Sequence, residues 1–182
     1  MLESKLYEKA CDAWSQTWEK LKTKLIPSIK DVRDFDDQLD LQQFISNWAQ
    51  DYEMELGNAG RKNTYYLKER IQFCAEFNEL FPLSSPLIIQ NMKRAIAESY
   101  FSLGEDKVGE EYFLKIIEEH PENIWSYIGY GDMYSMPLNG DAKPDFEKAE
   151  KIYSMALGKD LEEEEYLLER IADLKKEKEK SS

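Results

Sequence analysis

Residues 91–121 read NMKRAIAESYFSLGEDKVGEEYFLKIIEEHP, and the spacing within this stretch decides the predicted fold of the chain. Gly104 supplies a left-handed turn between two helical stripes, and Pro121 stops the second stripe. The small and aromatic residues that recur within the stripes are Ala97, Tyr100, Gly109 and Phe113. The stretch therefore predicts an antiparallel pair of helices, which is the unit of a helical solenoid.

The same pattern returns further along the chain. Tyr130-Gly131 lies 34 residues beyond Ile96-Ala97, and Tyr134 lies 34 residues beyond Tyr100. A fixed period of this length indicates a repeat architecture, in which each helix pair buries its apolar face against the next pair. We therefore expect a second helix pair after the first.

The second pair differs from the first by an insertion. Ala149 and Tyr153 lie 40 residues beyond Gly109 and Phe113, so six residues have been added between the two helices. The insertion falls within residues 135–144, which are rich in the turn formers proline, asparagine and glycine. This composition predicts an enlarged loop between two intact helices, the second of which ends at Gly158.

The chain on either side of the repeats is also helical by pattern. Apolar residues recur at helical spacing in three N-terminal segments, about 2–26, 41–56 and 63–81, the second of which we expect to stop at the breaker cluster 57–60. The third segment weakly echoes the repeat, with Arg70 at the position of the small residue, and we expect this arginine to turn outward. A final apolar stripe over 161–176 predicts a capping helix.

The overall prediction is an all-α protein made of antiparallel helix pairs in a short right-handed solenoid of about seven or eight helices. It forms a single domain over residues 1–176, with degenerate helices at 1–82, repeats at 85–121 and 123–158, and a capping helix at 161–176. Residues 177–182 are expected to form a disordered tail.

The composition restricts the partners. The chain of 182 residues contains 37 acidic and 24 basic side chains, a net charge of -13, and a charge of this sign repels phosphate backbones and anionic lipid. Nucleic acid and membranes are therefore not expected as partners. The two cysteines form no disulfide framework, and no apolar run typical of a signal peptide or membrane span occurs, so a cytoplasmic location is expected.

The small, aromatic and turn residues of 85–175 resemble those of tetratricopeptide-repeat proteins. A narrower resemblance covers nearly the whole chain: the run WAQDYEMELGNAG at 48–60, with AESYF at 97–101 and GYGD at 129–132, is similar to bacterial helical-repeat proteins that often end in a zinc-binding SEC-C motif. This chain has no cysteine after Cys74, so that metal site is not carried over. The resemblance implies a protein-interaction role without a known reaction.

No motif in the sequence supports catalysis. Gly-rich phosphate loops, Gly-x-Ser-x-Gly elbows and His-Glu-x-x-His helices do not occur, and His120 precedes Pro121 at a helix end. Cys11 and Cys74 lie on apolar stripes, where an inert buried thiol is usual. We therefore expect no enzyme activity, no cofactor and no metal, and a hydrolase or redox enzyme is the remaining alternative.

The predicted function is binding of a protein or peptide on the concave face of the array, beside the packing residues. The candidate binding residues are Asn91, Arg94, Glu98, Phe101, Trp125, Gly129 and Asp132. An arginine holds a carboxylate through two hydrogen bonds, and aromatic rings serve as apolar anchors.

The alternative is that the N-terminal helix fills this groove through its own tryptophans and that the protein forms a structural homodimer.

Overall fold

The computed structural model describes residues 2–39, 43–140 and 142–181. In these ranges the chain forms nine α-helices and no strand, so the all-helical prediction is confirmed and the predicted number of helices was too low. The helices are α1 (Leu2–Lys22), α2 (Val32–Gln38), α3 (Ile45–Gly60), α4 (Tyr65–Leu80), α5 (Pro86–Ser102), α6 (Asp106–Glu119), α7 (Ile124–Ser135), α8 (Phe146–Ser154) and α9 (Glu164–Ser181).

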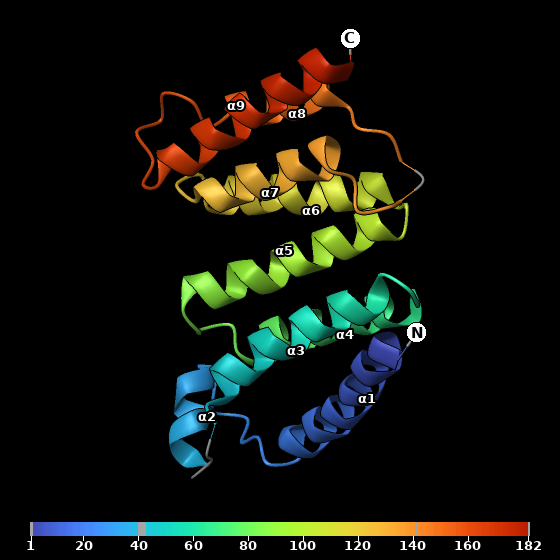
Figure 1. Ribbon diagram of the computed structural model, residues 1–182. Coiled ribbons are helices and arrows are strands. Elements are labelled where there is room, and N and C mark those ends of the chain that lie inside the picture. The colour runs from blue at the N-terminus through green and yellow to red at the C-terminus, as the bar shows by residue number, and fades with distance from the viewer. Residues whose placement is uncertain (1, 40–42, 141, 182) are drawn as a thin grey trace. The chain divides into compact units, whose positions relative to one another are not determined.

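The chain divides into two compact units, Met1–Ser99 and Tyr100–Ser182. Unit 1 contains α1 to α4 and most of α5, and unit 2 contains the end of α5 and α6 to α9, as the colours from blue to red in Figure 1 show. The predicted single domain over 1–176 and the predicted tail at 177–182 stay predictions. Helix α9 continues to Ser181 in the structure.

Aromatic rings from α1, α3 and α4 form the core of unit 1. The ring centre of Trp18 lies 5.0 Å from that of Phe73 in an edge-on contact, and Tyr52 lies 4.6 Å from Phe73. Trp48 stacks on Tyr52 at 5.3 Å. Because aromatic side chains bury large areas and prefer such offset contacts, this cluster fixes how the three helices pack. Figure 1 shows α3 and α4 side by side, with α1 against them.

The acidic segment after α1 supplies helix caps. Asp31 caps α2 by accepting a hydrogen bond from the backbone N–H of Arg33. Asp36 then caps α3, because its carboxylate accepts from the N–H of Ile45 and from the hydroxyl of Ser46. Carboxylates at these positions satisfy N–H groups that the first turn of a helix leaves unpaired. Asp34, Asp36 and Asp37 lie within the short helix α2, which was not among the predicted helices.

Two predicted helix ends were wrong. Helix α1 ends at Lys22, four residues before the predicted Ile26. Helix α3 continues through the predicted breaker cluster to Gly60. A Cβ atom at Gly60 would overlap the side chain of Leu67 in α4, so this glycine is required by close helix packing and does not terminate the helix.

In unit 2, helices α7 and α8 pack closely through a small residue and a ring. A Cβ atom at Gly131 of α7 would overlap the ring of Tyr153 of α8. The hydroxyl of Tyr153 donates to Asp132 at 2.6 Å and lies 3.0 Å from the hydroxyl of Ser135, so the ring is held in place over the glycine. Gly131 is therefore the residue that sets the distance between these two helices.

Residues 136–145 connect α7 to α8, with residue 141 outside the described ranges, and the reading of this loop as an insertion in a repeat stays a prediction. Asp145 holds the end of this loop against α7, because its N–H donates to the carbonyl of Tyr134 at 2.9 Å. Its carboxylate also caps α8. Gly104 has φ +77°, as predicted for the turn between α5 and α6. Helix α8 ends at Ser154, before the predicted Gly158.

Helix α9 packs against α7 and α8 with Leu167 and Leu174, which are buried, while Leu168 is exposed. None of the helices in the described ranges contains a stretch long and apolar enough to span a bilayer. The cytoplasmic location stays a prediction.

We predict that Gly131→Ala lowers the free energy of unfolding by up to about 2 kcal/mol. Alanine favours a helix by about 1 kcal/mol over glycine, but overpacking against a fixed ring costs about 1–3 kcal/mol, and here the overlap is with the Tyr153 ring itself. Urea unfolding measures the change. The control is Gly140→Ala in the exposed loop, where no described heavy atom lies within 4 Å of the added Cβ and the change is expected within about 0.5 kcal/mol.

A second prediction concerns pH. Glu76 accepts hydrogen bonds from Trp18 Nε1 at 2.9 Å and from Lys22 Nζ at 2.8 Å. Burial raises the pKa of Glu76, but the bonds from Lys22, Gln72 and Trp18 outweigh burial and hold the pKa below its ordinary value. The folded protein therefore binds this proton less readily than the unfolded chain, and the stabilisation is present above the unfolded pKa and lost as pH falls through the folded one.

Glu76→Gln is accordingly expected to lower the free energy of unfolding by about 1 kcal/mol at pH 7 and by progressively less as pH falls from 5 towards 3. Urea unfolding across this range measures the difference, with Glu79→Gln as the control on the exposed side of the same helix. An effect of Glu76→Gln that does not change with pH would contradict the assignment.

Candidate functional site

Arg70 of α4 is the centre of a buried ion network in unit 1. Arg70 is 9% exposed and Glu53 of α3 is 7% exposed. Nη2 and Nε of Arg70 lie 2.6 and 2.8 Å from the same carboxylate oxygen of Glu53. Nε also donates to the backbone carbonyl of Glu53 at 3.1 Å. Nη2 reaches Glu98 of α5 at 3.1 Å. One guanidinium group thus connects three helices.

The expectation that Arg70 turns outward was wrong. A Cβ atom at Gly57 of α3 would lie 3.3 Å from the guanidinium carbon, so the absence of a side chain there makes room for the arginine. Nη1 also lies 3.5 Å from the hydroxyl of Ser99, which itself donates to the carbonyl of Ala95. The arginine is buried because a small residue, two carboxylates and a hydroxyl surround it.

Burial and charge act against each other in this network. Burial disfavours the charged form of Arg70, but Glu53 and Glu98 outweigh it and raise the pKa of the guanidinium above its ordinary value. Burial raises the pKa of Glu53, and Arg70 opposes that rise. Since both partners are buried and in direct contact, removal of either leaves an unpaired charge in the core, which is far more costly than removal of both.

Glu98 of this network also belongs to a polar surface formed by α3 and α5. The Glu98 carboxylate contacts buried Arg70 and also lies 3.5 Å from Nε of half-buried Arg94. One turn away, the Asn91 amide donates to Gln50 of α3 at 3.3 Å. We call Gln50, Met54, Asn91, Arg94 and Glu98 the α3–α5 face. Sequence reasoning identified the three α5 residues and missed the two on α3.

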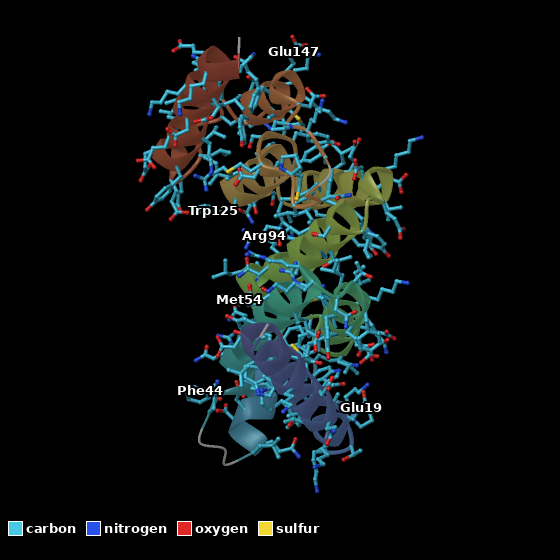
Figure 2. The ribbon with its side chains drawn as sticks, turned by 45° about the vertical axis from the view of Figure 1, so that its right-hand side comes forward. Glu19, Phe44, Met54, Arg94, Trp125 and Glu147 are labelled. Carbon is cyan, nitrogen blue, oxygen red and sulfur yellow. The ribbon has the colours of Figure 1, made fainter. Side chains whose placement is uncertain are left out.

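The α3–α5 face offers several groups to a ligand. Met54 is 57% exposed, and Figure 2 shows it and Arg94 projecting towards the same side of the view. Nε of Arg94 lies 3.5 Å from Glu98, and the arginine side chain is one-third exposed. A guanidinium fork binds a carboxylate through two parallel hydrogen bonds, and a methionine adapts to apolar side chains of varied shape.

The remaining candidates lie in unit 2, so the structure describes them separately from the three on α5. Trp125 is half-buried; its indole N–H donates to Glu163 at 2.6 Å, and its ring lies 5.2 Å from Tyr166. Asp132 accepts from Tyr153 and from Nε of Arg170, and therefore links α7 to α8 and α9. Gly129 is half-buried on α7.

Phe101 is a core residue of unit 2. Its side chain is 5% exposed, and its ring lies 6.1 Å from Phe113 and 5.5 Å from Tyr134. A ring enclosed in this way is not available to a ligand as an anchor, which corrects the expectation for this residue.

The tryptophans of α1 are accounted for within unit 1. Trp14 lies 6.1 Å from Trp48 and 5.8 Å from Tyr52, and Trp18 packs on Phe73 and Phe77. These rings face α3 and α4. The predicted homodimer stays a prediction.

The cysteines and the histidine lie in places that suit packing. Cys11 and Cys74 are free and buried, and burial raises the pKa of both thiols, that of Cys11 to about 12. Such thiols are poor nucleophiles, because the reactive species is the thiolate. His120 forms the C-cap of α6, with Nδ1 3.4 Å from Glu122. The described residues contain no cluster of three or more histidine, cysteine or acidic side chains arranged to hold a metal.

No protein-family model, curated protein or solved structure matched the sequence in the comparisons made. The assignment of a function therefore depends on the residues and geometry above.

We predict that Arg70→Met lowers the free energy of unfolding by about 3–5 kcal/mol, because it leaves Glu53 charged and buried without a partner. Adding Glu53→Gln to Arg70→Met is expected to recover much of the loss. Urea unfolding of both single variants and the double variant gives the coupling energy.

The control for this cycle is Arg33→Met, which removes a surface ion pair whose arginine side chain is 71% exposed and is expected to change stability by less than about 1 kcal/mol. Losses that simply add in the double variant would contradict a coupled pair.

Proposed function

We propose that this protein is a non-enzymatic helical-repeat module that binds a protein or peptide partner. The single observation that carries the proposal is the α3–α5 face, where Arg94 is held by Glu98 beside the Asn91–Gln50 amide pair. Both elements of this face are helices held by the buried Arg70 network, and a binding constellation on rigid elements is more precise than one on loops.

The repeat assignment supports the same function. The 34-residue spacing of Tyr100 and Tyr134 accompanies the pairing of a small residue with a ring at Gly131 and Tyr153. We infer that the helices form a short tetratricopeptide-like solenoid, a class of fold that uses the first helix of each pair for ligand contacts. Helices α3 and α5 hold that position in unit 1 and α7 holds it in unit 2, where Trp125, Gly129 and Asp132 are the candidate binding residues.

The expected ligand is an extended peptide segment with a carboxylate. The fork of Arg94 matches a carboxylate, whether a side chain or a free C-terminus, and the neighbouring amides match peptide N–H and C=O groups. Met54 adds an apolar contact at the edge of the same face. The chain has a net charge of -13 and as a whole repels anions. Binding of this carboxylate therefore depends on direct contact with Arg94.

A peptide-display selection on the immobilised full chain tests the proposal. Enriched peptides are expected to share an acidic residue or a free C-terminal carboxylate and to bind Arg94→Glu at least tenfold more weakly than the unaltered protein. Arg61→Glu makes the same charge change at an exposed position outside the face and is expected to change affinity less than twofold.

The selection also has outcomes that count against the proposal. Peptides that bind Arg94→Glu and Arg61→Glu equally well would remove the α3–α5 face as the binding surface. A selection that enriches no sequence family over the denatured protein would remove peptide binding itself. Trp125→Ala tests the candidate residues on α7 separately, because they lie in unit 2.

A further inference from the structure

A second concave site lies in unit 1, where α1, α3 and α4 meet. This pocket has a volume of about 310 Å³, and its walls include Asp12 of α1, Tyr52 of α3, and Tyr65, Tyr66 and Glu69 of α4. It shares no residue with the α3–α5 face. The volume is at the lower end of the range for ligand sites, which suits one side chain or one small organic ion.

Three tyrosine rings give the pocket an aromatic character. Tyr52 and Tyr66 are buried, while Tyr65 is 54% exposed at the edge of the pocket and makes an edge-on contact with Tyr66 at 5.2 Å. The hydroxyl of Tyr66 donates to Asp12 at 3.0 Å, which fixes the position of that ring. The faces of aromatic rings attract cations that lie within about 6 Å.

The pocket is also negatively charged. Asp12 and Glu69 line it, no lysine or arginine does, and no basic residue of the described ranges forms an ion pair with either carboxylate. Asp12 is exposed and Glu69 is half-buried, whereas the more enclosed Glu53, Glu76 and Glu110 each contact an arginine or a lysine.

The Cys11 thiol in the pocket wall is also affected by nearby negative charge. It is 1% exposed, and its pKa is raised to about 12 by burial first and then by Glu55, Asp12 and Glu8. Those three carboxylates come from α1 and α3, and Glu69 adds a fourth from α4. Asp12 and Glu69 therefore line the pocket, and Glu8 and Glu55 act on the thiol in its wall.

We propose that this pocket binds the charged end of an organic cation, an alkylguanidinium or alkylammonium group. The exposed ring of Tyr65 lies beside the charged end, and Asp12 and Glu69 neutralise it. A metal ion is a poorer fit, because the pocket supplies two carboxylates among aromatic walls and the described residues hold no metal cluster. An anion is excluded by the sign of the lining charges. The inference does not depend on the proposed peptide-binding function.

The cation is carried either by an arginine or lysine side chain of a partner or by a free amine, since both present the same group. Titrating the full chain with n-butylguanidinium, followed by amide NMR shifts at low ionic strength, tests the shared chemistry. The matched control ligand is n-butylurea, which has the same shape without the charge. Saturable shifts at pocket amides with the guanidinium and not with the urea are the expected result.

The variants locate the site. Glu69→Gln keeps the size of the side chain and removes its charge, and we expect n-butylguanidinium to bind five- to tenfold more weakly. Tyr65→Leu removes an exposed ring with little effect on the core and is also expected to weaken binding. Glu79→Gln makes the same charge change ten residues along α4, about 15 Å away, and is expected to leave binding within twofold.

A peptide arm separates the two sources. Tighter binding of acetyl-Gly-Arg-Gly-amide than of n-butylguanidinium assigns the pocket to a partner's side chain, and exclusion of the peptide while the small cation binds assigns it to a free amine. The proposal is overturned by equal shifts with n-butylurea, by equal losses in Glu69→Gln and Glu79→Gln, or by no saturation with 50 mM n-butylguanidinium. Arg94→Glu leaves the pocket intact, so a failure of the α3–α5 face is distinguishable from a failure here.

Discussion

Moving a guanidinium group out of water costs several kcal/mol unless carboxylates and other acceptors replace the lost hydration. Arg70 meets this condition through Glu53 in α3 and Glu98 in α5, with the Glu53 carbonyl as a further acceptor. A planar group with fixed donors accepts few alternative arrangements of its partners. Arg70 therefore constrains the alignment of α3, α4 and α5 in unit 1, while the aromatic cluster around Phe73 fixes the packing of α1, α3 and α4.

The same network determines which surface groups are held in place. Glu98 is shared between buried Arg70 and half-buried Arg94, so the interior and the α3–α5 face are coupled through one carboxylate. Two arginines and two glutamates make this cluster electrically balanced, although the chain carries a net charge of -13. The ion pair with Glu98 restricts the Arg94 side chain, so less side-chain freedom remains to be lost when a carboxylate binds.

Local patterns predicted most of the helices, and they failed where the deciding partner lies far along the chain. The turn at Gly104 and the loop between α7 and α8 depend on neighbouring residues, so composition sufficed. Arg70 was placed wrongly because its partners stand 17 and 28 residues away, and periodicity alone treats an arginine as a surface residue.

The glycine cluster of α3 illustrates the same limit. Sequence signals treat Gly57 and Gly60 as breakers, but one makes room for Arg70 and the other for Leu67, so tertiary packing overrides local propensity. On the candidate face, the α5 residues followed from helical spacing, whereas Gln50 and Met54 required knowledge of which helix packs beside α5. The pocket of unit 1 combines side chains from three helices, and no single segment contains its pattern.

The acidic composition has a structural use beyond solvation. Hydroxyl groups of buried and half-buried tyrosines repeatedly donate hydrogen bonds to carboxylates. The pairs are Tyr66 with Asp12, Tyr134 with Glu110 and Tyr153 with Asp132. A tyrosine packs its ring in the core and needs an acceptor for its hydroxyl at the edge, and a carboxylate is a strong one. Where a lysine or arginine also joins, as Lys148 does at Glu110 and Arg170 at Asp132, the charge is neutralised and the group serves the fold. Asp12 also accepts from a tyrosine, but it is exposed and no lysine or arginine lines the pocket beside it, so water and not a basic side chain stabilises its charge.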